Sequence, residues 1–202
     1  MIPALTMSNK WTNPPIDKKA KDSLWKNSQY FIEVLGEPRE EGNELIFPLK
    51  DLPFSGFKIR YDIERKFLGR IYAMVIEAKF VQRKMFHASG RIELRYSGFF
   101  KKGKPFFRTI PLKKGSSDED GVLKLLNGDQ RLIQECSKLD IEYLRLFIDS
   151  REEVWKVEVK PYGGSLIHMM LPPMRYNVIL IKNQAELILS IMKNIEQCNS
   201  GC

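Results

Sequence analysis

The chain has 202 residues, of which 43% are hydrophobic and 29% are charged, and its formal net charge is +8. This balance is typical of a globular protein and excludes a disordered or collagen-like chain. No apolar run approaches the roughly 20 residues that cross a bilayer, and the first residues lack the pattern of a signal peptide. We therefore expect a cytoplasmic protein with no integral membrane contact.

The expected organisation is one folded domain with a flexible segment at each end. Residues 1–16 contain Pro14 and Pro15, which disfavour a helix, and are predicted to be a flexible N-terminal segment. Residues 17–197 are predicted to form a single α+β domain, and residues 198–202 a disordered tail. The cysteines are few and odd in number, three, which argues against a disulfide framework.

The N-terminal part of the domain predicts one helix and three short strands. Asp17 can cap a helix that runs to residue 27. Residues 30–35 alternate between apolar and polar side chains, which predicts a strand that the following Gly-Glu-Pro ends. Two more short strands are predicted over residues 44–49 and 57–63.

The strongest strand signal covers residues 70–81. Its alternate positions are all apolar on one face, and the other face is apolar at its start, so this strand is predicted to be central and covered on both sides. Residues 91–96 alternate cleanly, with Ile92 facing inward and Glu93 facing water between two arginines. Residues 106–112 predict the return strand of a hairpin.

A helical region is predicted over residues 117–139, with Gly128 dividing it into two helices. Strands are then predicted over residues 142–148, 154–160, 165–171 and 176–180. Gly163-Gly164 is typical of a two-residue hairpin turn. The last helix is predicted to start at Asn183, with Glu186 completing a capping box, and its apolar residues recur at helical spacing: Leu187, Ile188, Ile191, Met192 and Ile195.

Groups of strands that alternate with helices, joined by hairpin turns, indicate an α+β fold. We predict an antiparallel sheet, built as meanders or hairpins. Two or three helices are expected to pack against it, including the amphipathic C-terminal helix.

The positive charge is concentrated in one segment. Residues 57–114 contain sixteen lysines and arginines against four acidic residues, a net charge of +12, whereas the rest of the chain carries seventeen against twenty-one, a net charge of −4. Such a segment indicates an anionic partner, such as nucleic acid, an acidic protein or a lipid headgroup. This reading requires the basic side chains to gather on one surface.

A basic turn between aromatic residues is the sharpest candidate binding site. Bases stack on rings and lysine or arginine contacts phosphates, so this mixture suits single-stranded nucleic acid. A hairpin with buried phenylalanines and a solvated tip explains the same residues. The candidate residues for nucleic-acid or anion binding are Arg91, Arg95, Phe99, Lys101, Lys102, Lys104, Arg108, Lys113 and Lys114.

The alternative is a carrier or sensor of an apolar small molecule. A curved sheet closed by the C-terminal helix can enclose a cavity, and its expected lining is Tyr72, Phe80, Trp155 and His168.

Catalysis has little support in the sequence. Neither His87 nor His168 has an acid and a nucleophile at a recognisable spacing. We expect a non-enzymatic binding protein without a cofactor or a metal.

Overall fold

The computed structural model describes residues 18–49, 53–81, 90–98, 103–110, 119–149 and 154–200. The strands within these residues are β1 (Arg39–Glu41), β2 (Glu44–Ile46), β3 (Gly56–Lys66), β4 (Gly69–Val81), β5 (Gly90–Tyr96), β6 (Pro105–Ile110), β7 (Ile141–Asp149), β8 (Val154–Pro161), β9 (Ser165–Met170) and β10 (Pro173–Val178). The helices are α1 (Lys18–Asn27), α2 (Gln29–Leu35), α3 (Glu119–Gly128), α4 (Gln130–Ser137) and α5 (Lys182–Ser200). The predicted flexible segment 1–16 lies outside the described residues.

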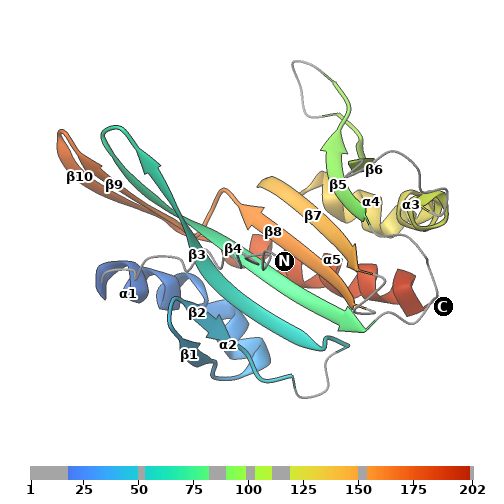
Figure 1. The fold of residues 1–202 in the computed structure, drawn as a ribbon, viewed down its shortest axis with the longest axis horizontal. Helices are drawn as coiled ribbons and strands as arrows, with labels where there is room; N and C mark the ends of the chain where they lie inside the picture. The colour runs from blue at the N-terminus through green and yellow to red at the C-terminus, as the bar shows by residue number, and fades with distance from the viewer. Residues whose placement is uncertain are drawn as a thin grey trace, which may run out of the picture.

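All the described strands pair antiparallel in one ten-stranded sheet (Figure 1). The strand order is β1-β2-β3-β4-β8-β7-β5-β6, and β9 and β10 extend from β4. This arrangement confirms the predicted α+β fold with an antiparallel sheet. None of the helices in the described part of the chain is long and apolar enough to span a membrane.

The long strand β4 lies at the centre of the sheet, as predicted, because it has neighbours on both sides. On one side, Gly69–Lys79 pairs with β3. On the other side, Ile76–Val81 pairs with β8 and Gly69–Tyr72 pairs with β9. The strands β8 and β9 therefore follow each other along the same edge of β4.

The segment Gly163-Gly164 is not the predicted hairpin turn, since β8 and β9 do not pair with each other. Gly164 instead has a φ of 81°, and its N–H donates to the carbonyl oxygen of Val178 at 2.6 Å. A Cβ atom at Gly164 would collide with the Met74 side chain. The glycine pair thus lets the chain step away from β4 and rejoin it, which periodicity alone does not distinguish from a hairpin.

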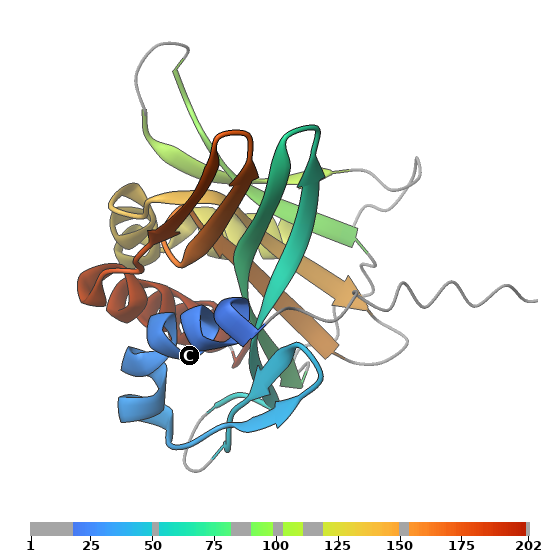
Figure 2. The ribbon, with the colours of Figure 1, turned by 90° about the vertical axis from the view of Figure 1, so that its left-hand side faces the viewer.

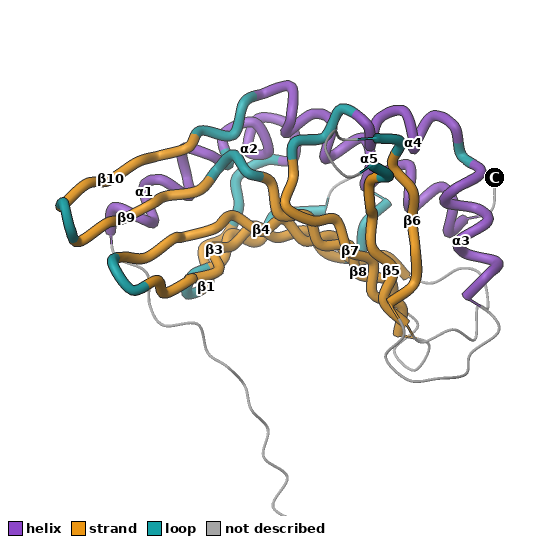
Figure 3. The backbone as a smooth tube through the Cα atoms, turned by 90° about the horizontal axis from the view of Figure 1, so that it is seen from above, coloured by secondary structure: helices purple, strands orange, loops and turns teal. Residues whose placement is uncertain are grey.

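Helices cover one face of the sheet (Figure 3), where α1, α2, α4 and α5 lie on the same side of the strands. The core lies between these layers and contains Phe31, Trp155 and Ile188, each with no exposed surface. The predicted apolar stripe of α5 faces this core. The opposite face of the sheet has no helix over it in Figure 3, and we call it the helix-free face.

The edge strand β6 is closed by a side chain from α3. The Asn127 amide oxygen accepts from the Phe107 N–H at 2.8 Å, and the amide nitrogen donates to the Phe107 carbonyl at 3.0 Å. Asn127 therefore bonds to the strand as a neighbouring strand would. Gly128 ends α3 as expected, and Asp129 caps α4 by accepting from the Leu132 N–H at 3.0 Å.

Three expected features are corrected. Residues 30–35 belong to the helix α2, because Phe31 and Leu35, four residues apart, both enter the core. The last helix begins at Lys182, so Asn183 lies in its first turn. This helix also extends to Ser200, past the expected domain end, and the Asn199 side chain donates to the Val81 carbonyl at 2.9 Å.

A charged, aromatic sheet face as candidate binding site

A row of charged side chains crosses six neighbouring strands on the helix-free face. Each member is the register partner of the next, and because side chains alternate across a strand they all share one face. We call it the charged row, and in strand order it consists of Lys58, Glu77, Glu158, Arg145, Glu93 and Arg108.

Two carboxylates stand directly opposite each other at the centre of the row. Glu77 and Glu158 are register partners and are only 4% and 8% exposed. The Arg60 guanidinium bridges them, with Nη1 3.7 Å from Glu77 and Nη2 3.6 Å from Glu158. Lys58 lies 3.8 Å from Glu77, and Lys156 lies 3.1 Å from Glu158. Cations from β3 and β8 thus offset a like-charge pair that would otherwise be destabilising.

One carboxylate holds three arginines further along the row. Glu93 is 3% exposed, and it contacts Arg145 at 2.9 Å, Arg95 at 2.5 Å and also Arg91. Burial, with Arg145 and Arg95 nearby, lowers the pKa of Arg91 from its usual value. Three guanidinium groups around a single carboxylate leave this part of the face positively charged.

The face also carries rings with cations stacked over them. The Arg145 guanidinium lies 3.7 Å from the Tyr143 ring centroid, and Lys156 Nζ lies 4.5 Å from the Phe147 centroid. Burial, with Glu158 and Asp62 nearby, raises the pKa of Tyr143. A guanidinium held flat on a ring presents a planar cation that a nucleobase or a phosphate can contact.

The opposite corner of the face is neutralised. Lys160 Nζ lies 2.8 Å from Glu142 and also contacts Glu64. Burial opposes the charged form of Lys160, yet the hydrogen bonds to Glu142 and Glu64 outweigh it and raise the pKa of the amine. Hydrogen bonds to Lys160 and Lys66 lower the pKa of Glu64. An anion finds less net positive charge here than around Glu93.

The outer strand β6 adds exposed groups to the positive part. Phe106 is 39% exposed and is the register partner of Arg95. Arg108 is exposed on the same face, and Lys104, just before the strand, is exposed as well. We call Arg95, Lys104, Phe106 and Arg108 the β6 rim.

The described members of the predicted anion-binding set lie together on or beside β5 and β6. Arg91 and Arg95 pair with Glu93, and Arg95, Lys104 and Arg108 are exposed in the β6 rim. The remaining five lie outside the described residues: Phe99, Lys101, Lys102, Lys113 and Lys114.

The basic residues of segment 57–114 do not all gather on one surface. Lys58 and Arg60 form ion pairs with Glu77 at the centre of the row. Arg65 and Arg70 lie at the far end of β3 and β4. Sequence reasoning missed Arg60, Arg145 and Tyr143 as parts of the site. The outward positions of their strands were the signal for these residues, but their convergence depends on strand order.

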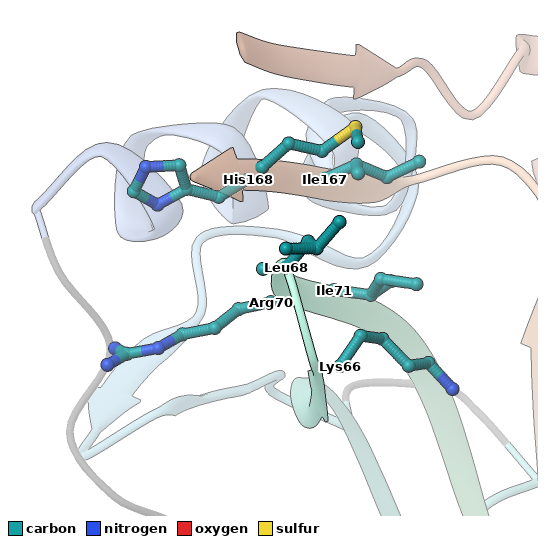
Figure 4. A pocket seen from close by; sticks show the side chains of 8 residues that line it. Lys66, Leu68, Arg70, Ile71, Ile167 and His168 are labelled. Carbon is teal, nitrogen blue, oxygen red and sulfur yellow. The ribbon is translucent and has the colours of Figure 1, made fainter. Parts of the chain in front are cut away.

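The residues of the predicted apolar cavity lie in two places, and Phe80 and Trp155 are register partners. Tyr72, Phe80 and Trp155 are buried in the core, so they fill space between the sheet and the helices. His168 instead lines a separate cavity of about 190 Å³ at the end of β4 and β9, where it points to the same side as its register partner Arg70 (Figure 4). His168 therefore lies apart from the three core residues.

A protein-family model described as "Protein of unknown function (DUF3156)" matches residues 33–199, from α2 to the end of α5. No curated protein and no solved structure matches the chain. Since the matched range spans most of the 202 residues, the chain belongs to the DUF3156 family.

Proposed function

We propose that this protein is a non-enzymatic binding protein that holds single-stranded nucleic acid on the β5–β6 side of its helix-free face. One observation carries the proposal: Arg91, Arg95, Arg108 and Arg145 occupy adjoining register positions around a single carboxylate, Glu93. The excess of cations there favours an anionic ligand.

The chemistry of the rim suits a single strand. Phe106 offers an exposed ring on which a base can stack, and Arg95 and Arg108 stand beside it to meet phosphates. Arg145, stacked on Tyr143, continues the surface inward. An open sheet face with rings and arginines lets unpaired bases lie flat, as in other sheet-based binders of single strands.

The test measures fluorescence anisotropy of labelled single-stranded DNA and RNA, with a duplex of the same sequence alongside. We expect the single strands to bind more tightly, and the binding to weaken steeply with added salt as counterions are released. Arg108→Glu and Phe106→Ala should each weaken the binding.

A matched control removes the effect of net charge. Arg131→Glu makes the same charge change on α4, where the side chain is exposed and away from the sheet face. If Arg131→Glu weakens binding as much as Arg108→Glu, or if no oligonucleotide binds at low salt, the proposal is wrong. Binding of an acidic protein in place of the oligonucleotide would also overturn it.

A further inference from the structure

Two hairpins project from the sheet at the end opposite the β6 rim, and their tips lie together. Figures 1 and 2 show the β3–β4 and β9–β10 hairpins extending side by side beyond the helices. Gly69 pairs with Met169 in register, and the Met170 N–H donates to the Leu68 carbonyl at 2.8 Å. The two turns therefore form one composite tip.

The tip exposes large apolar side chains. Phe67 is 96% exposed, Leu171 70% and Met170 62%, and Leu68 is also exposed. Turns usually carry glycine, asparagine or aspartate. Large apolar residues at these exposed turn positions are therefore unusual. Four such residues in contiguous turns indicate a surface that becomes covered in use.

The flanks of the tip are cationic and lack acids. Arg65, Lys66, Arg70 and Arg175 are exposed on the two hairpins. The sequence has no aspartate or glutamate in residues 65–76 or 159–185. Glu64, just below this zone, pairs with Lys66 at 2.9 Å, so the net charge near the tip remains positive.

Behind the tip is the cavity of Figure 4. Its lining includes the apolar side chains of Leu68, Ile71, Ile167 and Met169, together with Lys66, Arg70 and His168. The apolar part of this lining continues the apolar surface of the tip.

We propose that the composite tip docks the protein on an anionic lipid bilayer. Phe67, Leu68, Met170 and Leu171 would enter the boundary between headgroups and acyl chains, to a depth of roughly 5–10 Å. Arg65, Arg70 and Arg175 would then meet the anionic headgroups, each favouring binding through the surface potential. The site is distinct from the β6 rim and does not depend on it.

A protein partner fits the tip less well. In a dimer with a twofold axis at this site, the cationic flank of one copy would lie against the cationic flank of the other, and the two would repel each other. The tip is also narrow, and a stable protein interface needs about 800 Å² from each side. A bilayer accepts a narrow, convex, apolar tip without needing a complementary shape.

The experiment is co-sedimentation of the full chain with phosphatidylcholine vesicles, with and without phosphatidylglycerol. We expect binding only when phosphatidylglycerol is present, and weaker binding as salt rises. The pair Phe67→Ser with Leu171→Ser should lower the partition coefficient roughly tenfold or more. Arg65→Glu with Arg70→Glu should abolish the preference for phosphatidylglycerol.

Exposed apolar residues elsewhere supply the control. Val34→Ser on α2 with Leu125→Ser on α3 should bind vesicles as the wild type does, and circular dichroism shows whether each variant is folded. Unchanged binding by the folded tip variant, or no binding to either vesicle, would overturn the proposal. So would a dimer in sedimentation velocity that the tip variants dissociate.

Discussion

Glu77 and Glu158 face each other across β4 and β8, and the single Arg60 guanidinium contacts both. The two carboxylates come from positions more than eighty residues apart in the sequence, and the arginine comes from a third strand, β3. The relationship shows how this sheet tolerates buried carboxylates on a face without helices: long cationic side chains lie over them and exclude water.

Replacing Arg60 with alanine should destabilise the fold. The variant leaves two buried carboxylates opposite each other with only Lys58 and Lys156 as counterions. We expect a loss of about 2–4 kcal/mol in the free energy of unfolding, measured by chemical denaturation. Adding Glu158→Gln to Arg60→Ala should restore part of this loss. If the double variant is no more stable than the single one, the like-charge explanation is wrong.

Replacing Asp62 with asparagine should stabilise the protein at neutral pH. Burial raises the pKa of Asp62, despite the opposing effect of Arg60. Because the folded-state pKa lies above the unfolded one, ionisation favours the unfolded chain, and wild-type stability falls as pH rises through this interval. The variant lacks this loss. Its advantage in denaturation should therefore grow from acid to neutral pH, and an advantage that shrinks instead contradicts the assignment.

Three glycine-to-alanine variants separate backbone strain from steric collision. Gly164→Ala combines a φ of 81° with a Cβ only 3.1 Å from the Met74 Cβ, so we expect a loss of about 2–4 kcal/mol in stability. Gly42 has a φ of 61° but open space around it, so its variant should lose only about 1 kcal/mol. Gly128→Ala has neither problem and should change stability by less than about 1 kcal/mol. Thermal denaturation of the three variants gives this order directly, and equal losses would contradict it.

Tyr143→Leu should weaken oligonucleotide binding. The ring holds the Arg145 guanidinium flat on the sheet face, and without it the arginine loses a defined position. We expect about threefold weaker binding in the anisotropy titration, in line with the usual strength of a cation–ring contact. Tyr162→Leu, at an exposed tyrosine between β8 and β9, serves as the control and should bind normally.

The strands over residues 70–81, 91–96 and 154–160 could be predicted because alternation is a local property that each segment carries by itself. The segment 30–35 was misjudged for the same reason. Six residues are too few to separate a period of 2 from a period of 3.6, and the contacts of Phe31 and Leu35 with the core decide for a helix. The strand β1 has only charged residues, so no apolar pattern indicates it.

The sequence by itself determined the α+β class, the central strand, the apolar stripe of α5 and the uneven distribution of charge. Only the tertiary structure decided where that charge goes. Glu158 and Arg145, from outside the basic segment, pair with residues inside it, and strand order alone brings them together. Electrostatic contacts depend on distance in space, which a linear count of lysines and arginines does not contain. For that reason one basic segment separates into a neutralised centre, a cationic rim and a cationic tip.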